Sequence, residues 1–225
     1  MKLFLILFLI SFQTLATDIL LVGDSLTCGA FGQELTKLIA QEKQFPSREI
    51  TTYCAVSSRP EHWIEGKIPT GQICQTMSTS QLVFRNCGAN GRMPTFSELI
   101  NLNRPMVVIV ALGTNSLENS RPSTGYSKMI ELIPNGTKLI WIGPPHLRPE
   151  QARGFSTARL KAFEANLGSF YTNLKSILKD APLLDSRPFT IQGSAGGETV
   201  DGVHRGTIAG QAWANSMLSI INQQL

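Results

Sequence analysis

The stretch LLVGDSLTCGAFG runs from Leu20 to Gly32 and joins an aliphatic run to a segment of helical spacing. The aliphatic residues predict a buried strand, and Gly23 allows the sharp turn that must follow it. Ser25 comes directly after that turn, behind Asp24. In open α/β sheets, ligands bind beyond the carboxyl ends of the strands. Ser25 is therefore a candidate functional residue.

Strand-like and helix-like segments alternate along the rest of the chain. Short apolar, β-branched runs predict strands at 18–22, 50–56, 106–112, 138–142 and 182–185. Helical spacing occupies 33–41, 96–101, 126–132, 157–179 and 207–223. Strands this uniformly apolar suit a parallel sheet that is covered on both faces. We therefore expect an α/β protein, a three-layer α/β/α sandwich of about five parallel strands with right-handed crossovers.

The first sixteen residues, MKLFLILFLISFQTLA, differ in character from the rest of the chain. They have one early lysine, an apolar run from Leu3 to Phe12, and small residues near their end, which is the pattern of a secretory signal peptide. The run is shorter than the ~20 apolar residues that span a membrane. We predict a cleaved signal peptide at 1–16, a single domain at 17–225, and export to the periplasm or the medium.

Composition limits the partners and cofactors. The formal charge of +4 falls to +3 without Lys2, and no cluster of basic residues appears, so we expect no nucleic-acid partner. No Cys-x-x-Cys occurs and the three histidines are scattered, so we expect no metal. In an oxidising compartment the four cysteines can form two disulfides, in any of three pairings. These cysteines are Cys28, Cys54, Cys74 and Cys87.

The connection from Arg59 to Arg92 is long and rich in Gly, Ser, Thr and Gln. It holds two of the four cysteines. A stretch of this length without an apolar pattern is uncommon inside a domain unless it is a structured functional loop. We interpret it as an elaborated loop that disulfides hold in place.

A serine hydroxyl needs a base before it can act as a nucleophile. Asp201 precedes His204 by three residues in DGVHRG, just ahead of the last helical segment, and one turn of chain can bring this carboxylate to the imidazole. The other two histidines have no acidic residue at that spacing. Asn115 ends the third predicted strand in VALGTNS, where its amide can donate to a developing oxyanion. We predict Ser25 as nucleophile, His204 as base and Asp201 as its orienting carboxylate.

These blocks resemble the SGNH hydrolase superfamily, also called the GDSL family. GDSL at 23–26, GTN at 113–115 and DGVH at 201–204 are similar to its first, third and fifth blocks, in order and in spacing. The resemblance covers essentially the whole chain after residue 16. It implies a flavodoxin-like sandwich and ester hydrolysis through an acyl-serine, with no cofactor. It gives Asn115 the role of oxyanion donor and the other three residues the roles predicted above.

The second block departs from the family pattern. The family places a glycine after the second strand, whereas CAVSSRP places Ser58 there. A backbone N–H is all that this position must supply, so the predicted oxyanion hole consists of Ser25, Ser58 and Asn115. The passage at 53–74 is similar to exported bacterial members of the superfamily whose substrate is unassigned. That similarity favours a disulfide between Cys54 and Cys74, with Cys28 and Cys87 as the second pair.

The expected activity is that of a serine esterase with a small acyl pocket, since small residues surround Ser25. The preferred substrate is an O-acetyl group on a carbohydrate or cell-wall polymer. Transfer of the acyl group to an acceptor sugar, in place of water, is a variant of the same reaction. Two alternatives stay open: a lipolytic esterase or lysophospholipase, and a carbohydrate-binding protein without turnover. Arg59, Trp63 and His146 are candidate substrate contacts. We expect a monomer that binds a small-molecule or polysaccharide ester, with no stable membrane span after cleavage.

Overall fold

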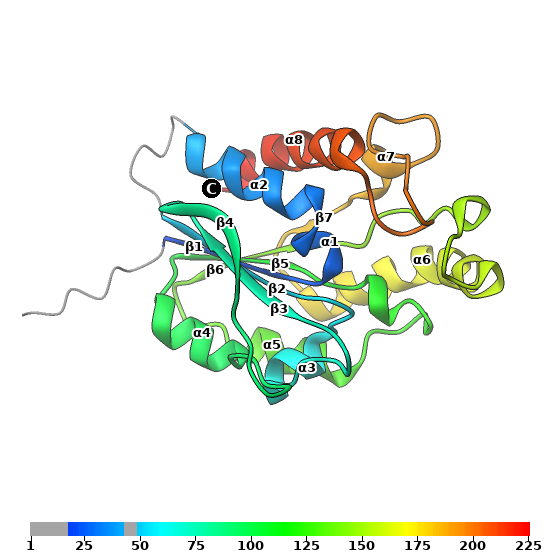
Figure 1. Cartoon of the computed structure of the whole chain (residues 1–225). Helices are drawn as coiled ribbons and strands as arrows, with labels where there is room; N and C mark the ends of the chain where they lie inside the picture. Colours follow the sequence, from blue (N-terminus) through cyan, green and yellow to red (C-terminus); the bar gives the residue numbers. More distant parts are fainter. Residues whose placement is uncertain (1–17, 43–48) are drawn as a thin grey trace, which may run out of the picture.

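One sheet lies at the centre of the protein (Figure 1). The computed structural model describes residues 18–42 and 49–225, so the predicted signal peptide at 1–16 lies outside the described residues. The strands of the described residues are β1 Ile19–Gly23, β2 Ile50–Ala55, β3 Cys74–Ser78, β4 Gln81–Asn86, β5 Val107–Ala111, β6 Lys138–Ile142 and β7 Leu183–Leu184. Their order across the sheet is β4-β3-β2-β1-β5-β6-β7.

The strands β2, β1, β5, β6 and β7 form the predicted parallel sheet. Every residue of β1 is buried, because helices cover this strand from both sides. Counting only the parallel strands, the order is 2-1-3-4-5, which is the flavodoxin-like order. The α/β fold and the flavodoxin-like sandwich are therefore confirmed. In this order the connections leave β1 and β5 toward opposite faces, and the crevice between their carboxyl ends is where ligands bind.

The long connection between Arg59 and Arg92 is more than a loop, so its interpretation was incomplete. It contains the hairpin of β3 and β4, which extends the sheet in an antiparallel sense beyond β2. The residues of β4 are mostly exposed, and Val83 keeps 69% of its surface in solvent. Because neither face of this edge strand is buried, its sequence lacks the apolar pattern by which the other strands were predicted.

Helices on both faces of the sheet complete three layers (Figure 1). Their bounds, with the two 3₁₀ turns η1 and η2, are α1 Ser25–Cys28, α2 Ala30–Gln41, α3 Pro60–Glu65, α4 Phe96–Asn103, η1 Thr114–Ser116, α5 Thr124–Glu131, η2 Pro149–Gln151, α6 Thr157–Leu178, α7 Arg187–Thr190 and α8 Thr207–Gln224. α2, α7 and α8 lie on one face, and α3, α4, α5 and α6 lie on the other. Within the described ranges, no helix combines the length and apolarity needed to cross a membrane.

The packing of α2 against α8 brings the two ends of the chain together. The ring of Phe31 in α2 stacks on Trp213 in α8, with centroids 3.6 Å apart. Gly210 allows this approach, since a Cβ there would lie 2.7 Å from Ala30. α2 begins five residues after Ser25, and α8 begins three residues after His204. Helix packing far from the reactive atoms therefore sets where these two side chains meet.

The disulfides differ from the favoured pairing. Cys28 is bonded to Cys54, and Cys74 to Cys87. In the β2–β3 register, Cys54 pairs with Gln75, and Cys74 pairs with the neighbour of Cys54. Successive residues of a strand point to opposite faces, so Cys54 and Cys74 cannot meet. The observed bonds instead tie the end of α1 to β2, and close the β3–β4 hairpin.

Candidate active site

Ser25 begins α1 at the carboxyl end of β1. The turn that precedes it needs glycine, because a Cβ on Gly23 would lie 1.9 Å from the Thr27 hydroxyl oxygen. Asp24 caps the helix, with its Oδ1 accepting a hydrogen bond from the Leu26 N–H at 3.0 Å. The N–H groups of Thr27 and Cys28 donate to the Asp24 carbonyl oxygen, both at 3.1 Å. The turn thus presents the Ser25 hydroxyl at the crevice between β1 and β5.

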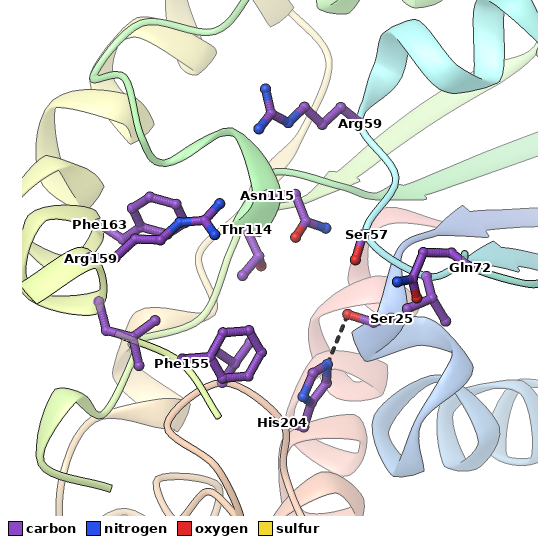
Figure 2. Close-up of a pocket in the computed structure, with 13 residues that line it drawn as sticks. Ser25, Ser57, Arg59, Gln72, Thr114, Asn115, Phe155, Arg159, Phe163 and His204 are labelled. Carbon is purple, nitrogen blue, oxygen red and sulfur yellow. Dashed lines mark hydrogen bonds between the residues drawn. The ribbon is translucent and has the colours of Figure 1, made fainter. Parts of the chain in front are cut away.

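His204 lies beside the Ser25 hydroxyl (Figure 2). Its Nε2 is 2.9 Å from Ser25 Oγ, and its Nδ1 is 2.7 Å from Asp201 Oδ2. A carboxylate at Nδ1 favours the tautomer that carries the proton there, which leaves Nε2 to accept the serine proton. The structure therefore brings together the three residues for which catalytic roles are predicted.

The turn at 201–204 is built around the carboxylate of Asp201. Its Oδ1 accepts hydrogen bonds from the N–H groups of Val203 and His204, at 2.9 and 2.8 Å. Burial acts to raise the pKa of Asp201, but the hydrogen bonds from the His204 ring and from these two N–H groups outweigh it and hold the pKa below its usual value. Gly202 closes the turn at φ +91°, a conformation that L side chains rarely adopt. The base is therefore oriented by a carboxylate that stays ionised.

Asp24 is almost fully buried, at 1% exposure. Burial raises its pKa to about 7, although the Leu26 N–H and the nearby His204 act in the opposite direction. Its second oxygen, Oδ2, accepts a hydrogen bond from Asn115 Nδ2 at 3.3 Å. Asp24 thus links the serine turn after β1 to the asparagine turn after β5.

Asn115 lines the same cavity as Ser25. Its Nδ2 also donates to the carbonyl oxygen of Ser58, at 3.1 Å. Together with the bond to Asp24, this contact fixes the side-chain amide at the wall of the cavity. Asn115, which follows β5, therefore connects Asp24 in the turn after β1 to Ser58 in the turn after β2.

Ser58 does not present its N–H to the cavity, which corrects the predicted oxyanion hole. This N–H donates to the Ala55 carbonyl oxygen at 3.1 Å, and the residue is fully buried. Its hydroxyl accepts a hydrogen bond from Trp63 Nε1 at 3.1 Å. The neighbouring Ser57 lines the cavity instead and has φ +59°. Ser57 therefore occupies the left-handed backbone position that glycine favours, one residue before the position predicted from the family pattern.

A cavity of about 350 Å³ opens beside Ser25 and His204. This volume is at the small end of the range for ligand pockets, ~300–1,000 Å³. Its far wall comes from Phe155, just before α6, and from Leu160 and Phe163 of α6. This wall could not be predicted from the sequence, because the aromatic and aliphatic spacing of α6 is typical of core packing. Arg159 of the same helix turn also lines the cavity.

The three predicted substrate contacts have different positions. Arg59 lines the cavity and forms an ion pair with Glu118 at 2.6 Å. Trp63 is fully buried, so its predicted substrate contact is wrong. Burial of its ring beneath the loop leaves only Nε1 to reach a polar partner, which is the Ser58 hydroxyl.

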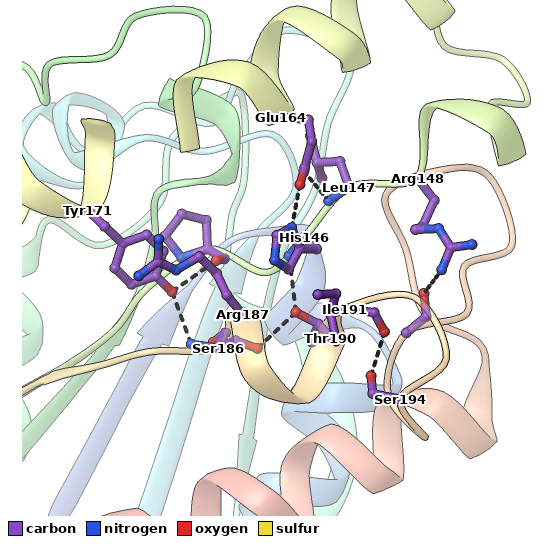
Figure 3. Close-up of polar contacts among 12 residues, drawn as sticks. His146, Leu147, Arg148, Glu164, Tyr171, Ser186, Arg187, Thr190, Ile191 and Ser194 are labelled. Carbon is purple, nitrogen blue, oxygen red and sulfur yellow. Dashed lines mark hydrogen bonds and ion pairs between the residues drawn. The ribbon is translucent and has the colours of Figure 1, made fainter. Parts of the chain in front are cut away.

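His146 also lies outside the cavity lining, so the structure does not place this predicted contact beside Ser25. Its ring Nδ1 pairs with Glu164 of α6, and its backbone N–H donates to the Thr190 hydroxyl oxygen at 3.0 Å (Figure 3). Glu164 Oε2 accepts the Leu147 N–H at 2.7 Å. These contacts hold the proline-rich turn after β6 against α6 and α7. The imidazole of His146 therefore stabilises that turn.

No protein-family profile and no curated protein sequence matches this chain. Solved structures do match it. A GDSL-like lipase from Bacteroides thetaiotaomicron has a TM-score of 0.59 at 14% identity, covering 92% of this chain and 88% of that one. A lipase/acylhydrolase from Enterococcus faecalis has a TM-score of 0.57 at 15% identity, covering 93% and 97%. Est24, a carbohydrate acetylesterase from Sinorhizobium meliloti, has a TM-score of 0.56 at 15% identity, covering 93% and 100%. The chain therefore has the fold of the SGNH hydrolases, the GDSL group of acylhydrolases, lipases and acetylesterases.

Proposed function

We propose that this protein is an exported serine esterase that removes a small acyl group, preferably acetyl, from a carbohydrate or cell-wall polymer. The observation that carries the proposal is the line of hydrogen bonds from Asp201 through His204 to Ser25. A binding protein without turnover has no need of a hydroxyl aligned with an imidazole and a carboxylate. The acylhydrolase and acetylesterase with the same fold support ester hydrolysis.

The proposed reaction begins when His204 Nε2 takes the Ser25 proton and Oγ attacks the acyl carbon. The carbonyl oxygen becomes an oxyanion, which accepts hydrogen bonds from the Ser25 N–H, the Ser57 N–H and one N–H of the Asn115 amide. This Asn115 N–H turns to the oxyanion from Asp24 Oδ2, the longer of its two contacts at 3.3 Å. Each such donor is typically worth ~10²–10³ in rate. The carbon–oxygen bond to the sugar breaks, and that oxygen leaves with the proton from His204. An acyl-serine remains.

Water completes the proposed cycle. His204 removes a proton from water, and the hydroxide attacks the acyl carbon of the acyl-serine. The bond between the acyl carbon and Oγ breaks, Oγ recovers its proton from His204, and the carboxylic acid departs. Asp201 stays ionised throughout and stabilises the imidazolium, which is consistent with the lowered pKa of its carboxyl.

The size and lining of the cavity support a small acyl group. A volume of about 350 Å³ lies at the small end of the range for ligand pockets and has room for an acetyl group and a sugar ring. Phe155 lines the cavity, and the centroid of its ring lies 6.2 Å from that of the His204 ring. Aromatic faces bind the apolar side of a sugar ring while hydroxyl groups stay in water. These features favour a carbohydrate ester over a long-chain lipid.

We also propose that residues 17–225 form one domain, that residues 1–16 are cleaved on export, and that the protein acts as a monomer. The two disulfides fit an oxidising compartment. The mass of the mature N-terminal peptide after export tests the cleavage.

A series of p-nitrophenyl esters from acetate to palmitate tests the activity, with the S25A variant as control. We expect hydrolysis that is fastest for acetate, falls with chain length, and is lost in S25A at unchanged circular dichroism. Fastest hydrolysis of the long chains would instead favour the lipolytic alternative. No hydrolysis of any ester would favour the binding protein. Activity retained in S25A would remove Ser25 as nucleophile.

A further inference from the structure

Arg159 places an unpaired positive charge inside the cavity. It belongs to the first turn of α6, and its guanidinium extends over the Phe163 ring, 4.9 Å from the centroid. Figure 2 shows this side chain across the cavity from Ser25 and His204, pointing toward Thr114 and Asn115. The charge is therefore directed at the space where the substrate of the proposed esterase would lie.

The two arginines that line the cavity differ in their partners. Arg59 is neutralised by Glu118 at 2.6 Å. No carboxylate in the described residues lies within ion-pair distance of Arg159. Of the two, only Arg159 is free to bind an anion without breaking an existing ion pair.

The position of Arg159 in its helix is electrostatically unfavourable. It is the third residue of a 22-residue helix that has no acidic residue in its first turn. The N-terminal end of a helix carries partial positive charge, so a cation there costs up to about 1 kcal/mol. The contact with the Phe163 ring offsets part of this cost, and an anionic ligand in the cavity would offset the rest.

The surroundings of Arg159 suit a carboxylate. The guanidinium carbon lies over the Phe163 ring, and the side chain lines the cavity. A guanidinium edge matches the two oxygens of a carboxylate. Arg159 is exposed to solvent, so its hydrogen bond to a carboxylate should weaken as salt is added.

We propose that the substrate of this protein carries a carboxylate, which Arg159 binds while the ester lies at Ser25. The inference rests on the proposed esterase function and specifies its substrate class: an ester of an acidic sugar, such as a uronic acid, or of a dicarboxylic acid. The two sources share one chemistry and differ in which side of the ester bond carries the charge.

Matched pairs of esters test the inference and distinguish the sources. For the sugar side, methyl O-acetyl-glucuronide is compared with methyl O-acetyl-glucoside. For the acyl side, the p-nitrophenyl monoester of adipic acid is compared with p-nitrophenyl hexanoate. Each pair is assayed with the wild type, with R159Q, and with R159K, which keeps the charge but loses the planar edge.

K161Q is the control variant. Lys161 is exposed two residues further along α6 and does not line the cavity. Residues at i and i+2 do not share a helix face, so K161Q removes the same charge from the same turn without changing the cavity.

We expect the wild type to prefer the charged member of one pair. R159Q should lower kcat/KM for that substrate by about tenfold to a hundredfold and change the neutral partner less than twofold. For the charged substrate, the kcat/KM of R159K should lie between those of the wild type and R159Q, and that of K161Q should match the wild type. The preference of the wild type for the charged substrate should weaken with added salt.

Three results would overturn the inference. Equal losses on charged and neutral esters in R159Q would mean that Arg159 has a structural role. Hydrolysis of p-nitrophenyl acetate with no charge preference in either pair would overturn this inference and leave the esterase assignment in place. No hydrolysis of any ester would overturn the esterase assignment, and this inference with it.

Discussion

His204 Nε2 lies 2.9 Å from Ser25 Oγ, although 179 positions of sequence separate the two residues. Two features of the fold produce this contact. The serine turn follows β1, next to the sheet position where connections diverge to opposite faces. The histidine turn leads into α8, which is held against α2 by the stacked rings of Phe31 and Trp213. The proposed chemistry depends on this arrangement.

Removal of the base and of its orienting carboxylate should have unequal effects. We expect H204A to lose nearly all turnover, whereas D201N should keep about a hundredfold more activity than H204A. The reason is that the imidazole in D201N still accepts the serine proton, although its tautomer is no longer fixed. Steady-state kcat values for p-nitrophenyl acetate measure the difference. Equal activity in both variants and the wild type would contradict the assignment.

The buried carboxyl of Asp24 should make folding stability depend on pH. Its pKa is about 7 in the folded protein against an ordinary value of 3.8. Between these values the folded state binds more protons than the unfolded state, so the free energy of unfolding should decrease as pH rises from 4 to 7. The full effect of one such group is about 4 kcal/mol.

The D24N variant isolates this group, because an amide does not titrate. We expect the stability of D24N relative to the wild type to increase from pH 4 to pH 8, measured by urea unfolding. The exposed Asp180 provides the control: D180N should keep the wild-type pH dependence. A wild-type slope that persists in D24N would show that another group is responsible.

Ser58 should matter for stability and little for rate. Its hydroxyl is the partner of Trp63 Nε1, and both residues are fully buried. S58A would leave that indole N–H without an acceptor, which costs about 1–3 kcal/mol. We expect the melting temperature to fall while kcat changes less than threefold, since the backbone of Ser57 stays in place. A large loss of kcat in a folded S58A protein would restore Ser58 to the oxyanion hole.

The disulfide between Cys28 and Cys54 should stabilise both the fold and the site. It closes a loop with a sequence separation of 26, for which chain entropy gives about 3–4 kcal/mol. For a domain of this size, that corresponds to a decrease of roughly 10 °C in melting temperature for the C28A/C54A double variant. The same bond ties α1 to β2, so kcat should fall as well. Calorimetry and p-nitrophenyl acetate kinetics measure the two effects, and an unchanged melting temperature would contradict this account.

Most of the fold could be predicted because the parallel strands are buried on both faces. The runs that contain Leu21 and Ile109 are apolar without interruption, and the helices between them keep a clear period. The β3–β4 hairpin could not be predicted in this way, because β4 is mostly exposed and β3 buries only Cys74 and Met77. The predicted disulfide pairing was wrong because the family similarity on which it was based does not reveal strand register, which fixes the face to which each cysteine points.

The candidate site was predictable where chemistry constrains sequence. Ser25, Asn115 and the pair Asp201 and His204 stand at strand ends or just before a helix, and they need particular side chains. The role first given to Ser58 needs only a backbone N–H, which leaves almost no trace in the sequence. Arg159 was missed for a different reason: its place in the cavity follows from the path of the loop before α6.

Covalent labelling tests the central claim most directly. A fluorophosphonate or sulfonyl fluoride reacts with a serine whose proton a neighbouring base can accept. The account predicts loss of esterase activity together with one adduct, located by peptide mass on Ser25, and no adduct in H204A. Inactivation with an unmodified Ser25 peptide, or with the adduct on another residue, would contradict it.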